Sequence, residues 1–331
     1  MPASPPQLSP QAPQAWSGRT RGGVSLFRVC AFLLPYVGRP GAWLGSFLIG
    51  GGFLLIGGRG QFGMVDYWRR LRPGIPPVLL VIRCWRHFAS FGRILCDRML
   101  VYVRPNAYAL TVNDGVATMR AALERRQGCI LLSAHLGNWE LSGFWLPQYL
   151  HNRHPIYLVM VRDDIPALQH FVDERMRGSQ ITVIDPRDGM SASLAIVQAL
   201  QAGHPVCMLG DRVFGDQAWK EVPFLGCPAR FPVGPFQTAM ITGVPIFTCF
   251  LVKSRAGAYH LHVDPPWRVR QEPRGARRDQ ALTAAVGEWA RRIEALVRRY
   301  PFQWHNFFGF WKAAERQLPA EQPPLPSGPP A

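Results

Sequence analysis

The sequence has no pattern typical of a metal site or of a disulfide framework. Its seven cysteines are scattered, mostly within apolar runs, and none belongs to a Cys-x2-Cys motif or to a Cys/His cluster with zinc-binding spacing. These absences argue against the zinc-binding and disulfide-stapled classes of protein and predict a reducing compartment. We therefore expect neither a bound metal nor any other cofactor.

Acidic residues are scarce relative to basic ones. The 331-residue chain has 21 Asp and Glu against 37 Lys and Arg, most of them Arg, which gives a formal net charge of +16. A surface of this sign favours polyanionic partners, namely nucleic acid or the headgroups of anionic lipids. The hydrophobic fraction of 48% is large enough for a sizeable core.

No signal peptide is expected, because no compact basic start precedes an apolar core and a small-residue cleavage site. Residues 1–23 are rich in Pro, Ser, Gln, Ala and Gly, and we expect them to form a disordered arm. Residues 313–331 are expected to form a disordered, proline-rich tail. The two tails leave residues 24–312 as the part that folds or contacts a membrane.

Residues 24–63 are predicted to be a membrane-associated helical segment. From Gly41 to Gly58 the chain has no charged residue over eighteen positions, which reaches the lower limit for a membrane-spanning helix. Seven of the eighteen are glycine, which lowers both the helical propensity and the hydrophobicity. Three alternatives remain: a span, a segment that dips into the bilayer, or a helical hairpin lying on its surface.

Strand-like and helix-like segments alternate after residue 128. Short apolar runs bounded by turn residues predict buried strands, and the segments between them have helical character. This order predicts an α/β fold with a mostly parallel central sheet flanked by helices, preceded by the N-terminal helical region. The expected strands are 129–134, 156–161, 181–184, 206–209, 245–252 and, at an edge, 259–263. The expected helices are 64–71, 77–103, 114–126, 139–150, 165–177, 190–201, 234–242 and 279–299.

The first of these strands runs directly into His135. A histidine at the carboxyl end of a strand, facing the start of a helix, lies where open α/β sheets bind ligands. Histidine exchanges protons near neutral pH and needs a carboxylate to fix its tautomer. Glu140 follows five positions later, across one tight turn, so the two side chains could meet. The alternative is a core histidine that ends a strand, with Glu140 in the first turn of a helix.

A protein nucleophile to accompany this pair is missing from the sequence. No serine stands in a Gly-x-Ser-x-Gly motif, and no cysteine stands beside His135. The simplest interpretation is that His135 deprotonates a hydroxyl of the substrate, which then attacks an activated acyl group.

Two further segments carry candidate binding residues. Asp211 and Arg212 follow the strand 206–209, which puts them on the same edge as His135 if the sheet is parallel; the alternative is a surface ion pair or turn. Arg230 lies in a loop punctuated by Pro and Gly (221–235) that suits the lining of an apolar chain, with the arginine near a phosphate. The alternative for that segment is a plain loop.

An aromatic segment at 300–311 closes the ordered part of the chain. Such a segment suits nucleic-acid stacking, an aromatic belt at a membrane interface, or simple packing. Basic residues are almost absent from it, which argues against nucleic acid and leaves packing as the default.

Together these segments resemble the bacterial lipid A late acyltransferases (lauroyl and myristoyl transferases) of the lysophospholipid acyltransferase superfamily. The resemblance rests on AHLGNWE at 134–140, LGDR at 209–212, VPFLG at 222–226 and TGVP at 242–245, in the order of that family. The closing QWHNFFGFW at 303–311 is similar to a subgroup found with glycolipid, ornithine-lipid or aryl-polyene pathways. That subgroup usually has Asp at the position of Gly309 and an aromatic residue at that of His305. The resemblance covers roughly residues 24–312.

The resemblance implies an acyltransferase α/β domain over residues 64–312, located at the cytoplasmic face of a bacterial inner membrane. A fatty acyl group would move from a thioester of acyl carrier protein or CoA to a hydroxyl or amine of a lipid or glycolipid. His135 would be the general base and Glu140 its orienting partner. The residues expected to bind or position substrate are Asn138, Asp211, Arg212 and Arg230.

Two competing hypotheses remain at this point. The first is a non-catalytic basic protein that binds anionic lipid or nucleic acid, and its only support is the net charge. The second is a non-catalytic relative of the acyltransferases, suggested by Gly309. Under the acyltransferase hypothesis the partners are the thioester donor, the lipid acceptor and a membrane, and no nucleic acid is expected.

Overall fold

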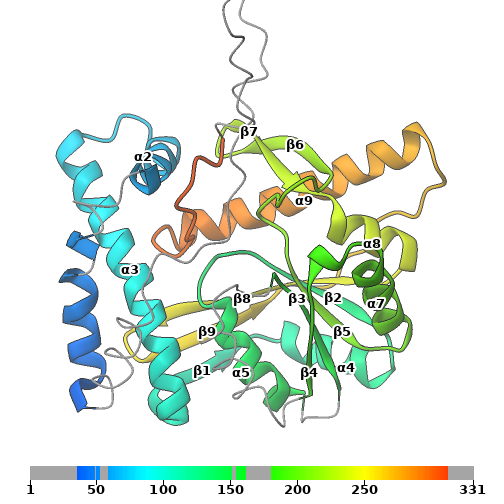
Figure 1. Cartoon of the computed structure of the whole chain (residues 1–331), viewed down its shortest axis with the longest axis horizontal. Coiled ribbons are helices and arrows are strands. Elements are labelled where there is room, and N and C mark those ends of the chain that lie inside the picture. Colours follow the sequence, from blue (N-terminus) through cyan, green and yellow to red (C-terminus); the bar gives the residue numbers. More distant parts are fainter. Residues whose placement is uncertain (1–35, 49, 53–58, 151–153, 162–179, 312–331) are drawn as a thin grey trace, which may run out of the picture.

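The computed structural model describes residues 36–48, 50–52, 59–150, 154–161 and 180–311 (Figure 1). The predicted arm at 1–23, the tail at 313–331, much of the segment 24–63 and the predicted helix 165–177 lie outside the described residues. The predicted division of the chain into these segments stays a prediction.

A seven-stranded sheet forms the centre of the molecule, with the strand order β1-β9-β8-β2-β5-β3-β4. Neighbouring strands run parallel except for the antiparallel pair β8 and β9, so the predicted α/β fold with a mostly parallel sheet is confirmed. The strands are β1 (Ala109–Val112), β2 (Cys129–Ser133), β3 (Ile156–Val159), β4 (Ile181–Ile184), β5 (Pro205–Leu209), β8 (Ile246–Arg255) and β9 (Ala258–Val263).

Helices cover both faces of this sheet because its central strands are apolar on both sides. Alternate residues of β2 point into two different cores: Ile130 packs in the core that includes Trp289, whereas Leu131 packs in the core that includes Leu141. The helices after the first two are α4 (Gly115–Glu124), α5 (Trp139–Tyr149), α7 (Met190–Gln201), α8 (Gly234–Thr242) and α9 (Ala276–Arg299). The core containing Ile130 takes in α7, α8 and α9, and the core containing Leu131 takes in α4 and α5.

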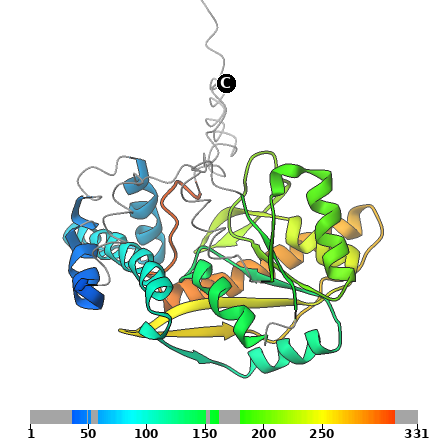
Figure 2. The ribbon, with the colours of Figure 1, turned by 60° about the horizontal axis from the view of Figure 1, so that its bottom comes forward.

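The N-terminal helices group at one side of the sheet, and α7 lies at the opposite side (Figures 1 and 2). Residues 36–48 and 50–52 are helical, followed by α2 (Arg59–Leu71) and α3 (Pro77–Val103). Pro77 opens α3 at a position where a missing N–H costs nothing. In the described part of the chain, no helix combines the length and the apolar character needed to cross a membrane.

The structure differs from the predictions at two places. The strand 259–263 was expected at an edge, but the unpredicted strand β1 pairs with β9 on its outer side, so that prediction was wrong. β1 has only four residues and is mostly exposed, so it has no apolar run by which it could be recognised.

The second difference is a β-hairpin where a loop was expected. β6 (Trp219–Phe224) and β7 (Cys227–Pro232) form an antiparallel pair whose tight turn places Leu225 and Gly226 at positive φ. Pro223 faces Pro228 across this two-stranded sheet, and the prolines had argued against strands in the sequence. The hairpin packs on α9, where the amide of Leu225 donates to the Glu294 carboxylate at 2.7 Å.

Candidate active site

Two neighbouring parallel strands deliver the central pair of the site. β2 and β5 pair in register up to Ser133 and Leu209, and the amide of Gly210 extends the pairing by donating to the Ser133 carbonyl at 2.9 Å. His135 and Asp211 each follow two residues after the end of their strand. Because the strands run in the same direction, these side chains meet at one edge of the sheet.

The Asp211 carboxylate is the hydrogen-bond partner of His135. The Nδ1 of His135 lies 2.8 Å from Oδ1 of Asp211, and the backbone amide of His135 donates to Oδ2 at 3.1 Å. Asp211 is fully buried, whereas the imidazole keeps 19% of its surface exposed. The two bonds fix both the ring and its main chain, and no described residue hydrogen-bonds to Nε2. That nitrogen is therefore free to exchange a proton with a substrate.

Electrostatics set the protonation states of this pair. Burial lowers the pKa of His135 below its usual value, and the positive charge of Arg212 lowers it further, while Asp211 opposes both effects. Burial alone would raise the pKa of Asp211, but the contacts with His135 and the charge of Arg212 hold it at about 2. At neutral pH the carboxylate is charged and the imidazole is neutral, so Nδ1 carries the proton that Asp211 accepts. The lone pair then lies on Nε2, as a general base requires.

The aromatic segment predicted to be packing also reaches this pair. The indole Nε1 of Trp304 donates to Oδ2 of Asp211 at 3.2 Å, and the backbone amide of His305 donates to the carbonyl of His135 at 2.8 Å. The amide of Gly137 donates to the carbonyl of Gln303 at 2.8 Å, so the two segments pair briefly like antiparallel strands. We call residues 300–311 the aromatic strap, because they lie across the turn after His135 and hold it.

Glu140 lies in the first turn of α5, as predicted, but its carboxylate forms an ion pair with Arg98 of α3. No hydrogen bond joins it to His135 among the described residues. Its side chain is 38% exposed, in contrast to the buried Asp211. The structure thus brings His135 together with Asp211 rather than with Glu140, and places Glu140 where it fixes α5 to α3.

Asn138 shapes the turn between His135 and α5. Its backbone amide donates to the carbonyl of Leu251 at 2.8 Å, and its carbonyl accepts from the amide of Leu141, the third residue of α5, at 3.0 Å. Its buried side-chain amide donates to the carbonyl of Ile94 at 3.2 Å and to the hydroxyl of Tyr259 at 3.3 Å. The side chain is therefore held inside the protein by α3 and β9, and its contacts are those of a structural residue.

The two predicted arginines lie in different places. Arg212 donates to the carbonyl of His305 at 2.6 Å and stacks on Phe308, so it joins the pair to the aromatic strap. Arg230 lies on β7 of the hairpin, where its guanidinium stacks on Trp219 at 3.9 Å and faces Glu221 at 3.6 Å. The structure brings Arg212 to the site, and gives Arg230 partners within its own hairpin.

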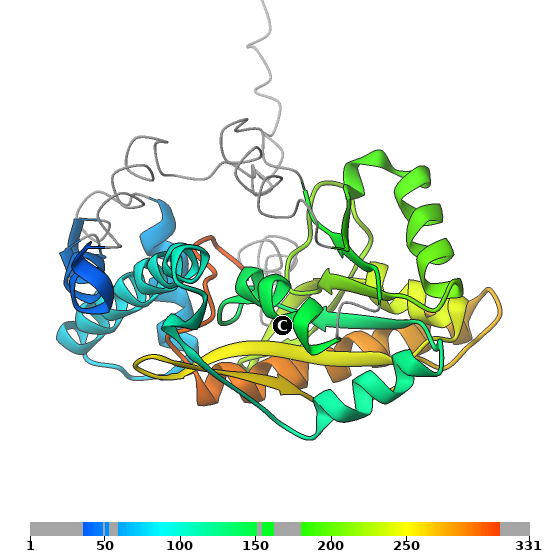
Figure 3. The same ribbon diagram turned by 90° about the horizontal axis from the view of Figure 1, so that it is seen from below.

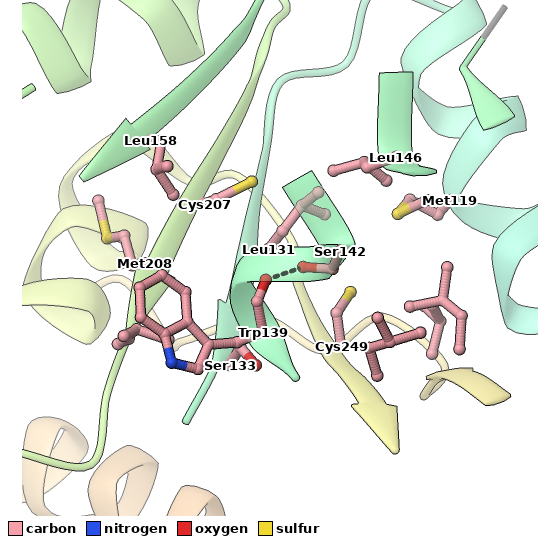
Figure 4. A pocket seen from close by; sticks show the side chains of 14 residues that line it. Met119, Leu131, Ser133, Trp139, Ser142, Leu146, Leu158, Cys207, Met208 and Cys249 are labelled. Atoms are coloured by element: carbon pink, nitrogen blue, oxygen red, sulfur yellow. Dashed lines mark hydrogen bonds between the residues drawn. The ribbon is translucent and has the colours of Figure 1, made fainter. Parts of the chain in front are cut away.

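An apolar cavity of about 50 Å³ adjoins this pair, between the sheet and α5 (Figure 4). Leu131, Cys207 and Leu146 are among its lining residues, and no charged side chain lines it. Trp139 lines the cavity and also packs edge to face on the His135 ring, with the ring centroids 5.8 Å apart. The hydroxyl of Ser142, another lining residue, donates to the carbonyl of Trp139, so this polar group has a partner within α5 (Figure 4). The histidine and the apolar cavity therefore share one wall.

The amides of Trp139 and Glu140, at the start of α5, have no acceptor among the described residues. Free amides at a helix N-terminus form a local positive field that favours an anion. Their position next to the histidine and the cavity makes them candidates for stabilising a developing oxyanion. No group of three or more His, Cys, Asp or Glu within the described part of the chain is arranged to hold a metal ion.

Sequence reasoning assigned Asp211 to substrate and did not identify Trp304. The signal for Asp211 was present: it follows its strand by the same two residues as His135, and parallel neighbours align such positions. No local signal connects Trp304 to Asp211, because 93 residues separate them and an aromatic segment is compatible with simple packing.

Comparison with known proteins assigns the chain to a family. The sequence model of the bacterial lipid A biosynthesis acyltransferases matches residues 85–313, which include β2, the His135 turn, β5 and the aromatic strap. The chain belongs to this family. The resemblance inferred from the sequence motifs is thereby confirmed.

Curated relatives of this lipid A acyltransferase family member include two mycobacterial proteins. A phosphatidylinositol mannoside acyltransferase of Mycolicibacterium smegmatis is 26% identical over 194 residues, which are 58% of this chain and 60% of the relative. The protein of the same name from Mycobacterium tuberculosis is 26% identical over 212 residues, or 61% of this chain and 60% of the relative. The chain thus spans about 60% of the length of the curated relatives it matches.

Proposed function

We propose that this protein is an acyltransferase that moves a fatty acyl group from a thioester donor to a hydroxyl or amine of a lipid or glycolipid. The observation that carries the proposal is the pair of His135 and Asp211 next to an apolar cavity, where no Ser, Thr or Cys side chain of the described residues bonds to the histidine. Family membership and the names of the mycobacterial relatives support the choice of a lipid acceptor.

The reaction follows from the arrangement of the site. Nε2 of His135 removes the proton from the acceptor hydroxyl or amine as its oxygen or nitrogen attacks the thioester carbonyl. Asp211 stabilises the imidazolium that forms, and the free amides of α5 face the oxyanion of the tetrahedral intermediate. The C–S bond then breaks, and the leaving thiolate takes the proton from His135. The products are the acylated acceptor and a free thiol.

The cavity suits the acyl part of the donor. Its apolar lining favours a hydrocarbon chain over water, and Trp139 joins its wall to the histidine. We propose that the thioester carbonyl lies between the His135 ring and the start of α5, with the first carbons of the acyl chain directed into the cavity, whose volume of about 50 Å³ is too small for a whole chain. The donor is acyl carrier protein or CoA, and the assay below supplies both.

We place the protein at the cytoplasmic face of the bacterial inner membrane, where thioester donors and lipid acceptors meet. The net charge of +16 suits a surface rich in anionic headgroups, and the free cysteines among the described residues suit a reducing compartment.

A set of three variants tests the assignment of roles. His135→Ala should abolish transfer, and Asp211→Asn should lower kcat by about 100-fold or more, because the wrong tautomer is then favoured. Glu140→Gln should keep most of the activity, since its carboxylate pairs with Arg98 and not with the base. The assay supplies acyl carrier protein or CoA thioesters with bacterial lipid extract, and mass spectrometry identifies the acylated lipid.

Each variant has a distinct outcome that would contradict the proposal. Normal turnover by His135→Ala would remove the histidine from the mechanism. A larger loss in Glu140→Gln than in Asp211→Asn, at unchanged thermal stability, would return the orienting role to the glutamate.

A further inference from the structure

A buried polar network lies beside the turn from β2 into α5. Its centre is the carboxylate of Asp97 in α3, which is buried. Oδ1 of Asp97 accepts from the hydroxyl of Tyr108 at 2.6 Å, and Oδ2 accepts from the hydroxyl of Tyr259 and from the ammonium of Lys253. Three donors on one buried carboxylate offset much of the cost of removing it from water, and they fix its orientation.

The strands β8 and β9 bring two of these donors to α3. Lys253 and Tyr259 lie opposite each other on the two strands, so their side chains share one face of the sheet. The two strands extend from the centre of the sheet as far as α3 (Figure 3). Asp97 bonds to both side chains there, which joins α3 to the end of this strand pair.

The network reaches the turn through the hydroxyl of Tyr259. This hydroxyl donates to Asp97 and accepts from the side-chain amide of Asn138 at 3.3 Å. Burial and the neighbouring carboxylate raise the pKa of Tyr259 well above its usual value, so the hydroxyl keeps the proton that it donates. Two hydrogen bonds in series therefore connect Asn138 to α3.

Lys253 makes a second connection through its main chain. Its amide donates to Oε1 of Gln303 at 2.8 Å, and its carbonyl accepts from Nε2 of Gln303 at 2.9 Å. The carbonyl of Gln303 accepts in turn from the amide of Gly137. The two residues that bond to Asp97 from β8 and β9 are thus connected to two consecutive residues of the turn, Gly137 and Asn138.

The turn is held from both sides of β2. On one side, β5 supplies Asp211, which bonds to His135. On the other side, β8 and β9 supply the connections to Gly137 and Asn138. The next two residues of the chain carry the amides at the start of α5 that face the oxyanion in the proposed reaction. The network around Asp97 therefore holds the main chain directly before these amides.

We propose that Asp97 is a positioning residue for acyl transfer, which acts through Tyr259 and Asn138 to place the first amides of α5 at the developing oxyanion. The proposal rests on the function proposed above. A buried ion pair is often no more stabilising than well-packed apolar side chains, but it fixes one arrangement of its partners. Donors at an oxyanion are effective when they are held in place before the charge develops. A displaced turn lowers the rate of the chemical step and leaves the binding of the ground-state donor unchanged.

The test compares two variants that each remove one phenolic hydroxyl from Asp97. Tyr259→Phe disconnects Asn138, whereas the hydroxyl lost in the matched control Tyr108→Phe has no other hydrogen bond among the described residues. With acyl carrier protein or CoA thioesters as donors, Tyr259→Phe should lower kcat about tenfold at unchanged KM. Tyr108→Phe should keep the wild-type kcat. Thermal unfolding shows whether the two variants lose the same stability.

Binding of two inert analogues separates positioning from a loss of folded protein. A phosphonate analogue of the tetrahedral intermediate should bind Tyr259→Phe about tenfold more weakly than the wild type, in proportion to kcat. An S-alkyl thioether of the active donor, which has no carbonyl, should bind both proteins equally. The acidic limb of kcat/KM against pH should stay in place, since the bonds between His135 and Asp211 are unchanged.

Asp97→Asn keeps the shape of the side chain, removes its charge and should reproduce the loss of kcat, which gives a second route to the answer. The double variant Asp97→Asn/Tyr259→Phe should lose no more kcat than Asp97→Asn alone, because both changes break one connection.

Equal kcat in folded Tyr259→Phe and Tyr108→Phe would overturn the proposal. So would additive losses in the double variant, or binding of the thioether that weakens in proportion to kcat. A wild-type protein that transfers no acyl group would contradict the proposed function and this proposal with it, whereas the other outcomes arise only in an active enzyme.

Discussion

At the scale of single residues, the site depends on how one carboxylate is shared. Asp211 accepts bonds from the His135 ring, the His135 amide and the Trp304 indole, so each of its oxygens is fixed. A carboxylate held in this way cannot rotate away from the imidazole. The pair is therefore preorganised before any substrate binds, which is the property expected of a general base and its partner.

Arg212 should control the pH dependence of the reaction. Its charge lowers the pKa of His135, so Arg212→Gln should raise that pKa and require a higher pH to keep the base neutral. The acidic limb of the profile of kcat/KM against pH should move to higher pH than in the wild type. The control is Arg230→Gln, which removes an arginine from the hairpin and should leave this limb in place. An acidic limb that moved to lower pH in Arg212→Gln would show that the arginine does not act on His135 through its charge.

The sequence placed His135 correctly just after the end of its strand but did not identify the carboxylate that bonds to it, and the catalytic roles of both residues stay predictions. The strand before it and the turn after it are local patterns, so the histidine could be placed at the sheet edge. The carboxylate that reaches it comes from the next strand in space, not from the next helix in sequence. Glu140 lies five positions after His135 in the sequence, but its side chain pairs with Arg98 of α3. The spacing of residues along the chain gives no information about a partner on another helix.

At the scale of elements, the turn from β2 into α5 is the critical connection. Gly137 has a φ of +73°, and an added Cβ would lie 2.1 Å from the carbonyl oxygen of Leu251 in β8. The amide of Gly137 also donates to the carbonyl of Gln303 in the aromatic strap. Only glycine fits both the backbone conformation and the close approach of β8.

Gly137→Ala should therefore damage both stability and activity. We expect a loss of about 3 kcal/mol or more in the free energy of unfolding, because the Cβ clash is with main-chain atoms. The matched control is Gly74→Ala: Gly74 has a similar φ of +76° but open space around its Cβ, so only about 1 kcal/mol should be lost. Urea denaturation measures both. Equal losses of unfolding free energy in the two variants would show that the positive φ, and not the close approach of β8, is the reason that Gly137 cannot be replaced.

Elements with strong periodicity were predicted well, and those defined by partners were not. α3, α7 and α8 have the bounds expected from the sequence, since their apolar spacing and flanking Pro or Gly are local signals. β1 and the hairpin of β6 and β7 were missed. Each is short, exposed or proline-containing, and each exists because β9 or α9 offers a surface on which it packs.

At the scale of the whole molecule, the fold buries two histidines, His87 and His305, that take no part in the proposed mechanism. His87 is fully buried between α2 and the strap, where its Nε2 lies 3.1 Å from the carbonyl of Trp304. Burial lowers its pKa to about 3. His305 packs 5.8 Å away with both ring nitrogens unbonded within the described structure, and burial also holds its pKa well below the usual value.

These histidines should make the protein sensitive to mild acid. A histidine that is neutral in the folded state but protonated in the unfolded state favours unfolding once the pH falls below the unfolded pKa of about 6.5. From pH 7 to pH 5, His87 alone should reduce the free energy of unfolding by about 2 kcal/mol. His87→Gln keeps a donor for the Trp304 carbonyl and should flatten this dependence. Urea denaturation at both pH values gives the slope.

The control for that measurement is His154→Gln, a partly exposed histidine that should leave the slope unchanged. A wild-type protein equally stable at pH 5 and pH 7 would contradict the assignment of buried neutral histidines. Neither buried histidine could be identified from the sequence, because each is buried by contacts between elements that are far apart in the chain. His87 of α3, for example, packs against Tyr67 of α2 and Phe302 of the aromatic strap.

The aromatic strap also sets the order of events during synthesis. Trp304 and His305 leave the ribosome long after β2 and β5 have been made, yet they complete the support of His135 and Asp211. A nascent chain that has folded its sheet still lacks the indole and the main-chain contact that hold the base. The support of His135 is therefore completed only after every strand of the sheet has been made, and a chain that ended before residue 300 would lack it.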